Sequence, residues 1–226
     1  MRVDDTQGAG DFSASTPAPP GARRVLVVDD SRDGAESLGM MPKIDRWVLR
    51  SVLTWCAARL KARPGAPLPM MCVNISGRAL RSSSFLAAAR EEFNAAGVPP
   101  RSVCFEISER DVVEHPASAQ EFIATLKPLG CRFTLDSFGS VKVSFSYLEG
   151  LAFDFLKIDG VIIEGIHTQL GAATVKAINI VCREVGMRTI AEFVESKATL
   201  DRLREIGVDY IQGFGVARPE AITKFA

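Results

Sequence analysis

Short apolar runs alternate with amphipathic segments along most of the chain. The amphipathic segments carry apolar residues at helical spacing, and Gly130, Gly186 and Gly207 close three of them, as glycine often does at helix ends. The apolar runs are hydrophobic on both faces, which indicates strands covered by helices on either side. Strands are predicted at 70–74, 102–106, 132–136, 154–159, 188–192 and 209–213, and helices at 84–97, 116–130, 173–186 and 196–207.

Strands of this kind, each followed by a covering helix, predict an α/β fold with a parallel sheet. Six such units could form an open doubly wound sheet or most of a closed barrel. We favour a TIM-like (β/α)8 barrel, because no glycine-rich phosphate loop follows the first apolar strand, as it would in a dinucleotide-binding sheet.

The first forty residues differ from the rest. Residues 1–22 are rich in Gly, Ala, Ser, Thr and Pro, and we expect them to be a disordered leader. Residues 23–38 contain a compact apolar strand, 25–28, followed by two acids, and residues 39–226 form the barrel domain. The first helix of that domain carries Trp47 and Trp55, and we expect both to pack in the core or between helix and barrel.

Composition narrows the function classes. Lys and Arg together number 27, as do Asp and Glu, so the formal net charge is zero, which argues against general affinity for DNA or membranes. The five cysteines are scattered and the two histidines isolated, which favours reduced thiols over a disulfide framework and makes a zinc site improbable. Neither a signal peptide nor a membrane span is apparent, and we expect a cytoplasmic protein.

Polar residues recur where the predicted strands end. In a parallel barrel these positions share one rim, the C-terminal face, where catalytic groups gather. Several carboxylates and an amide at one mouth repel one another unless a cation lies among them, and such oxygens suit Mg²⁺, Mn²⁺ or Ca²⁺. Any one of them taken alone is better explained as a turn former or helix N-cap. The residues are Asn74, Glu106, Asp136, Lys157 with Asp159, Glu192 and Gln212.

Several of these residues lie in motifs that carry a resemblance. The segments "MMPKIDRW", "VNISG", "CFEIS", "LDSFGS", "YLEGLAFDFLKIDG", "RTIAEFVES" and "IGVDYIQGFGVARP" occur in this order over about residues 39–219. They resemble the successive signatures of the bacterial EAL-domain family. The resemblance implies a (β/α)8-type barrel that binds cyclic di-GMP and, in active members, hydrolyses it to linear pGpG with two Mg²⁺ or Mn²⁺ ions.

The resemblance also implies roles for individual residues. Asn74, Glu106 and Asp136 would hold the first metal ion. Lys157 would assist the attacking water, with Glu192 and Gln212 beside it, and Glu109 would steady the loop that follows Asp136. Contacts to the substrate would come from Asp159, Gln212 and Arg218.

Three departures from the family pattern predict weak or absent hydrolysis. The strand that carries the family's Glu-Ala-Leu signature has no counterpart, and Ser137 replaces the second acid of an Asp-Asp pair. The next loop reads "GSVKVSFSYL", in which Val141, Lys142 and Val143 replace small flexible residues, and β-branched residues stiffen a loop. Each of the two metal sites would lose one ligand, so we expect the residues to hold one ion and not a pair.

The segment "RRVLVVDDSRDGAESLGM" resembles the opening strand and helix of a response-regulator receiver domain, but no further receiver unit follows. One hypothesis places "VLVVDD" in the vacant first-strand position of the barrel, with Asp29 or Asp30 near the position of the missing glutamate. Otherwise the barrel is incomplete at its first strand, and the exposed sheet edge invites pairing with another chain.

Three interpretations of the whole chain remain open. The first is a catalytically impaired EAL-type module that binds cyclic di-GMP or a protein partner, with a homodimer also compatible. The second is a working metal-dependent phosphodiesterase, and the third is a gene remnant without function.

Overall fold

The computed structural model describes residues 25–28, 40–141, 145–218, 220 and 222. Seven parallel strands form one sheet in the order β1 to β7, so each strand pairs with the next one along the chain. The strands are β1 (Val25–Val28), β2 (Met70–Ile75), β3 (Val103–Ser108), β4 (Arg132–Phe138), β5 (Phe155–Ile158), β6 (Arg188–Ala191) and β7 (Tyr210–Ile211).

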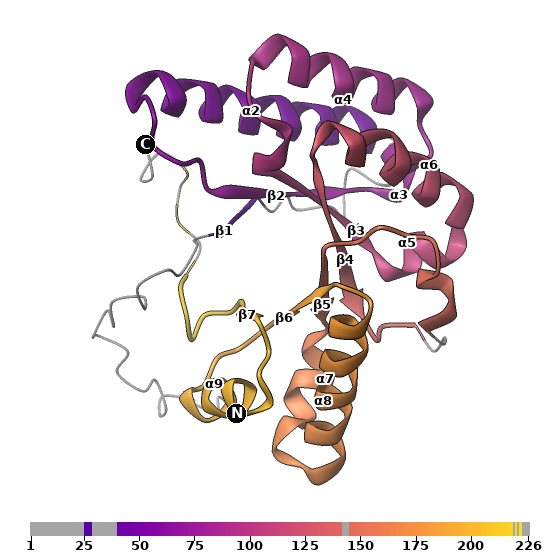
Figure 1. Ribbon diagram of the computed structural model, residues 1–226, viewed down its shortest axis with the longest axis vertical. Coiled ribbons are helices and arrows are strands. Elements are labelled where there is room, and N and C mark those ends of the chain that lie inside the picture. Colours follow the sequence, from indigo (N-terminus) through magenta and orange to yellow (C-terminus); the bar gives the residue numbers. More distant parts are fainter. Residues whose placement is uncertain (1–24, 29–39, 142–144, 219, 221, 223–226) are drawn as a thin grey trace, which may run out of the picture.

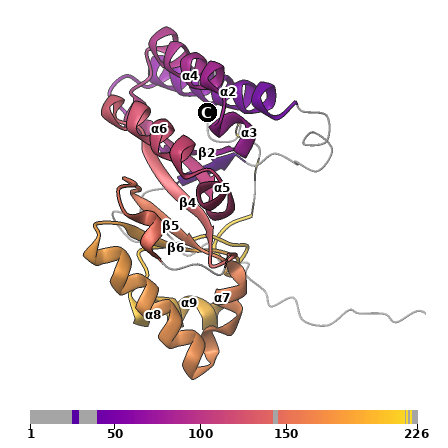
Figure 2. The same ribbon diagram turned by 90° about the vertical axis from the view of Figure 1, so that its right-hand side faces the viewer.

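Helices follow most of the strands and lie along the outer side of the curved sheet (Figures 1 and 2). The first group, beside β2 to β4, comprises α2 (Met41–Ala62), α3 (Gly77–Leu80), α4 (Ser83–Ala96), α5 (Glu109–Glu114) and α6 (Pro116–Leu126). The second group, beside β5 to β7, comprises α7 (Gly160–Glu164), α8 (Gln169–Glu184) and α9 (Lys197–Ile206). Short 3₁₀ turns occupy Pro100–Ser102, Lys127–Leu129, Phe145–Leu148 and Gly165–His167.

This is the predicted TIM-like α/β arrangement, and each of the six predicted strands is present within a few residues of its expected bounds. The sheet begins with β1, which pairs in parallel with β2 from Val25 opposite Met70 to Val28 opposite Val73. Residues 25–28 therefore take a strand position beside the strand that bears Asn74. No pairing joins β7 back to β1 among the described residues, so the sheet they form is open at that seam.

The two faces of the sheet have different neighbours because side chains alternate along a strand. The outer face of the sheet packs against the helices and forms the larger core, with Phe105, Phe122 and Phe133 among its most deeply buried side chains. The inner face carries a smaller apolar layer, made by Cys72, Cys104, Phe155 and Ile190, with Met70 and Tyr210 partly buried at its ends.

Some expectations fall outside the described residues. These are the disordered leader at 1–22, most of the fragment at 23–38 including Asp29 and Asp30, and the stiffened loop at Lys142 and Val143. One expectation was wrong. Trp55 is half-buried against the core, but Trp47 is 68% exposed, because it lies on the side of α2 that faces away from the sheet.

Candidate functional site

The candidate site lies at the carboxyl ends of the strands, directly above the inner apolar layer. Because side chains on one face recur every second residue, the residue two positions after each inner-layer residue points to the same side. Asn74 thus follows Cys72, Glu106 follows Cys104, and the same holds for Lys157, Glu192 and Gln212 after Phe155, Ile190 and Tyr210. Asp136 follows Thr134, a fully buried hydroxyl 3.1 Å from Cys104 Sγ.

Lys157 is the centre of the site. Its Nζ lies 2.8 Å from Glu192 Oε1, 3.0 Å from Asp136 Oδ1 and 3.2 Å from Glu106 Oε2. The side chains of Lys157, Glu106 and Glu192 are buried, with residue exposures of 4%, 2% and 7%. Three predicted carboxylates and the predicted lysine, which are spread over 87 positions of sequence, therefore converge on one point.

Electrostatics at this point are set by burial and by the excess of acids over bases. Burial lowers the pKa of Lys157, but Glu106, Asp136 and Glu192 outweigh it, so the pKa is raised and the ammonium stays charged. Burial raises the pKa of Glu192 to about 7 and also raises that of Glu106, although Lys157 opposes both shifts. Since one ammonium cannot balance two buried carboxylates and the partly buried Asp136, Glu192 can take up or release a proton near neutral pH.

Asp136 reaches the cluster through an irregularity in β4. The pairing of β4 with β5 shifts register between Leu135 and Phe138, and Ser137, inside that interval, has the positive φ of 56°. Such bulges redirect side chains at the ends of strands. Asp136 Oδ1 is buried close to Lys157 Nζ, but the two atoms do not have hydrogen-bond geometry.

Glu109 holds the loop that follows this bulge. Its Oε2 accepts hydrogen bonds from the backbone N–H groups of Gly139 (2.9 Å) and Val141 (3.0 Å), and its Oε1 accepts one from Tyr147 Oη (2.7 Å). Burial and Glu109 together raise the pKa of Tyr147, which stays a proton donor. The carboxylate is itself buried, so the loop is tied to the start of α5.

The remaining predicted residues lie around the same rim. Asn74 is next to Glu106 in the register of β2 and β3, and Gln212 follows β7, with its N–H bonded to Ala191 O. Asp159 caps α7, accepting a hydrogen bond from Val161 N–H at 2.8 Å. Arg218 lies farther along the chain, with its guanidinium 5.9 Å from the ring centre of Phe214.

Two contributors were missed by sequence reasoning. Tyr147 hydrogen-bonds Glu109. In the sequence its role was indicated only by its place in the "GSVKVSFSYL" loop. Cys72 was expected only to be one of five scattered reduced thiols, yet its side chain hydrogen-bonds the neighbouring Cys104 and Glu106, and these contacts together with burial raise its pKa. The two-residue spacing of Cys72 from Asn74 and of Cys104 from Glu106 places both thiols just beneath the site.

The donor set fits a divalent cation only in part. Asn74, Glu106 and Asp136 offer the oxygen ligands that Mg²⁺ and Mn²⁺ prefer, and the buried Asp136 Oδ1 lacks a hydrogen-bond partner. Within the described residues, however, no group of three or more His, Cys, Asp or Glu side chains is arranged to hold a metal ion. The oxygens of these described residues thus suit one divalent cation in their chemistry.

Comparison with known proteins agrees with this geometry. The EAL domain family matches residues 20–219, most of the chain. The chain belongs to the EAL domain family. An EAL relative, cyclic di-GMP phosphodiesterase PdeB of Shewanella oneidensis, is 32% identical over 203 residues, which cover 89% of this chain and 23% of PdeB. Cyclic di-GMP phosphodiesterase PdeA of Borreliella burgdorferi is 33% identical over 151 residues, 66% of this chain and 22% of PdeA.

Solved EAL structures have the same fold. The FimX EAL domain of Pseudomonas aeruginosa bound to c-di-GMP is 28% identical with a TM-score of 0.75, over 82% of this chain and 74% of that one. The PaMucR phosphodiesterase in complex with c-di-GMP is 25% identical with a TM-score of 0.77, over 85% and 77%. This EAL chain spans about a quarter of the length of the curated relatives it matches.

Two general expectations can be compared with the structure. No helix in the described part of the chain combines the length and the apolar content needed to cross a bilayer. All five cysteines are buried and free.

Proposed function

We propose that this EAL domain binds cyclic di-GMP and is impaired as a phosphodiesterase. Two EAL domains with the same fold are known bound to c-di-GMP, and the mouth of the sheet carries the polar residues that such a ligand would meet. The observation that carries the proposal is the buried Lys157 cluster with the uncharged Ser137 beside Asp136. A lysine and three acids remain, while the acid expected at Ser137 is replaced.

In this proposal Asn74, Glu106 and Asp136 would hold one Mg²⁺ or Mn²⁺ ion. A divalent ion bound there would act as a Lewis acid toward a phosphoryl oxygen. Lys157 keeps three carboxylates oriented and carries the positive charge that a phosphodiester requires nearby. Gln212, Asp159 and Arg218 would contact the ligand at the rim.

Glu192 is the proposed proton acceptor for water. Its pKa of about 7 lets it exist as the free carboxylate in part of the population near neutral pH, and Lys157 fixes its Oε1 at 2.8 Å. The residue that is lacking is an acid at Ser137, so the proposal predicts that binding survives better than turnover. A cytoplasmic location is proposed with it, because buried free thiols suit a reducing compartment.

The test has two parts. Calorimetric titration with cyclic di-GMP, with and without Mg²⁺, should show binding, and a chromatographic assay for pGpG with Mg²⁺ or Mn²⁺ should show little product. Ser137→Asp should raise turnover. Ser137→Asn should not, because asparagine has the shape of aspartate and also tolerates the positive φ at this position but carries no charge. If Ser137→Asn and Ser137→Asp raise turnover equally, the missing charge is not the cause of the impairment.

A second candidate function is an intact phosphodiesterase, favoured by the convergence of Glu106, Asp136 and Glu192 on Lys157. Turnover in the unmodified chain comparable to that of PdeB would support it and refute the impairment. No binding of cyclic di-GMP, together with a broad thermal transition, would instead support a remnant without function.

A further inference from the structure

The outer face of α2 forms a separate surface of basic and aromatic residues. Lys43, Arg46, Trp47 and Arg50 are exposed and recur at spacings of three and four residues, so they occupy one side of the helix. The opposite side of α2 is buried against the core. We call these four residues the α2 outer face. The neighbouring exposed hydroxyls of Ser51 and Thr54 donate to backbone carbonyls of the helix itself.

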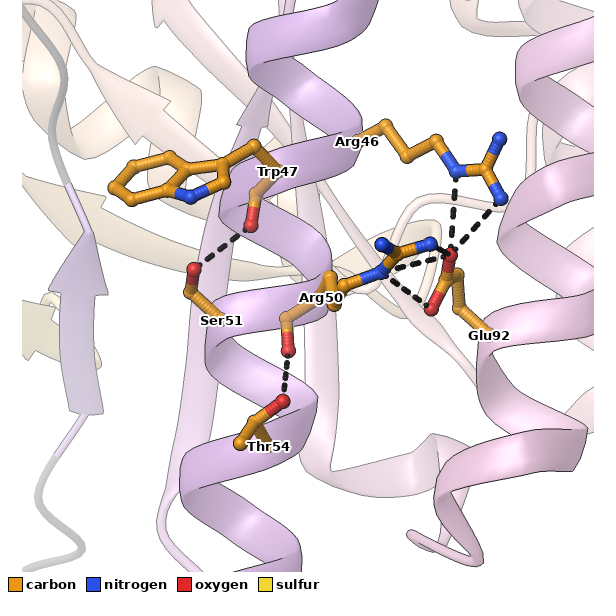
Figure 3. Close-up of polar contacts among 6 residues, drawn as sticks. All are labelled: Arg46, Trp47, Arg50, Ser51, Thr54 and Glu92. Carbon is orange, nitrogen blue, oxygen red and sulfur yellow. Dashed lines mark hydrogen bonds and ion pairs between the residues drawn. The ribbon is translucent and has the colours of Figure 1, made fainter.

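Both arginines of this face are held in place by one acid from α4 (Figure 3). Glu92 Oε1 accepts hydrogen bonds from Arg46 Nε and Nη2 at 3.2 and 3.1 Å, and from Arg50 Nη2 at 2.5 Å. Two guanidinium groups on one carboxylate leave a net positive charge. No hydrogen bond or ion pair of either Nη1 group occurs among the described residues, so each arginine keeps donors that a ligand could use.

Trp47 completes the α2 outer face. Its indole is 68% exposed and extends from the edge of this face opposite to the one that carries Arg46 (Figure 3). No stacking partner for this ring occurs in the part of the chain that the structure describes. Tryptophan and arginine are the residues that most often carry the energy of protein interfaces.

We propose that the α2 outer face binds an acidic amphipathic helix of another protein. Carboxylates along one side of that helix would pair with Arg46, Arg50 and Lys43, and an apolar residue beside them would cover Trp47. The charge complementarity is local, because the whole chain has a formal net charge of zero and so lacks the field that attracts nucleic acid or anionic membranes. One indole without an apolar stripe is also too little to anchor a helix in a bilayer.

The experiment uses the full chain with Trp55→Phe, which leaves Trp47 as its sole tryptophan because the sequence has two. The probe is a synthetic helical peptide with leucines on one side and glutamates flanking them, and the matched control peptide has glutamine at each glutamate. The proposal expects a blue shift of Trp47 fluorescence with the acidic peptide at lower concentration than with the glutamine peptide. Equal titration by the two peptides, or no shift, overturns it.

Variants separate recognition from a structural role. Arg46→Gln with Arg50→Gln should weaken peptide binding about three- to tenfold, the range for two exposed ion pairs. Glu92→Gln breaks the same α2–α4 contacts but removes the competing acid, so it should bind the peptide at least as tightly as the parent. Weaker binding by Glu92→Gln overturns the proposal. So does a blue shift with phosphatidylserine vesicles alone, or burial of Trp47 in a dimer seen by sedimentation.

Discussion

Replacing Lys157 by methionine tests whether the ion cluster organises the site. Lys157→Met keeps most of the side-chain volume but removes the cation that lies within 3.2 Å of Glu106, Asp136 and Glu192. An uncompensated buried charge costs about 3–5 kcal/mol when one partner of a buried pair is removed. We therefore expect the free energy of unfolding of the metal-free protein to fall by about 3–5 kcal/mol near neutral pH.

The matched control is Lys127→Met. Lys127 Nζ pairs with Asp154 at 2.6 Å, a shorter contact than any made by Lys157, but both side chains are about one-third exposed. Water screens such a pair, so its loss should cost about 1 kcal/mol or less. Urea unfolding followed by circular dichroism, with EDTA present, measures both variants. Equal losses for the two lysines would refute the reasoning, because burial would then not govern the cost.

Two further measurements refine this prediction. In Lys157→Met the three carboxyls can neutralise themselves by binding protons, so the deficit should shrink on going from about pH 7 to about pH 5. A cation can also replace the ammonium, so added Mg²⁺ should stabilise Lys157→Met more than the parent protein. A deficit that changes with neither pH nor Mg²⁺ would indicate lost packing in place of lost charge.

Three other predictions concern individual residues. The pKa of Glu192 is raised to about 7, so between about pH 4.5 and 7 the folded protein holds a proton that the unfolded chain has released. The free energy of unfolding of the metal-free protein should therefore fall by at most about 3 kcal/mol as the pH rises through this range. Glu192→Gln should flatten that slope in urea titrations at several pH values, and an unchanged slope would contradict the assignment. Glu109→Gln should lower the free energy of unfolding by about 1–3 kcal/mol and speed hydrogen exchange at the amides of Gly139 and Val141, which lose a charged acceptor. Unaltered exchange would argue that Glu109 does not hold this loop. Gly213→Ala should lower the free energy of unfolding by about 1–3 kcal/mol more than Gly150→Ala. Both glycines have positive φ, but only at Gly213 would the new Cβ meet backbone, 2.3 Å from Val194 N. Equal melting temperatures of the two variants would rule out that clash.

Sequence reasoning predicted the sheet well because a buried parallel strand leaves a strong pattern. Each of the six predicted strands is in the sheet, and the polar residue at its end falls on the inner side for a simple geometric reason, the two-residue period. The ends of strands were less predictable. The pattern ended β4 at Asp136, but the strand runs to Phe138, because a register shift lets Ser137 adopt positive φ without ending the strand.

Other features depended on three-dimensional neighbours that periodicity does not contain. Helical spacing identified the apolar side of α2 that packs on the sheet. It could not show that Trp47, beside that apolar side, is left exposed to solvent. The thiol of Cys72 was read as an isolated core residue, because nothing in the sequence shows that Cys104 and Glu106 come beside it across two strands. Contacts between strands are set by register, and register is fixed only when the sheet assembles.

A formal net charge of zero conceals two opposite local imbalances. At the mouth of the sheet three acids surround one lysine in a buried setting, while two exposed arginines of α2 share one acid from α4. Salt screens exposed charges over about 10 Å at 0.1 M ionic strength but has little effect on buried ones. Rising ionic strength should therefore weaken an acidic peptide on α2 while leaving the Lys157 cluster intact. The two surfaces can thus be assayed separately in one protein, and a loss of cyclic di-GMP binding in Arg46→Gln with Arg50→Gln would mean that they are coupled.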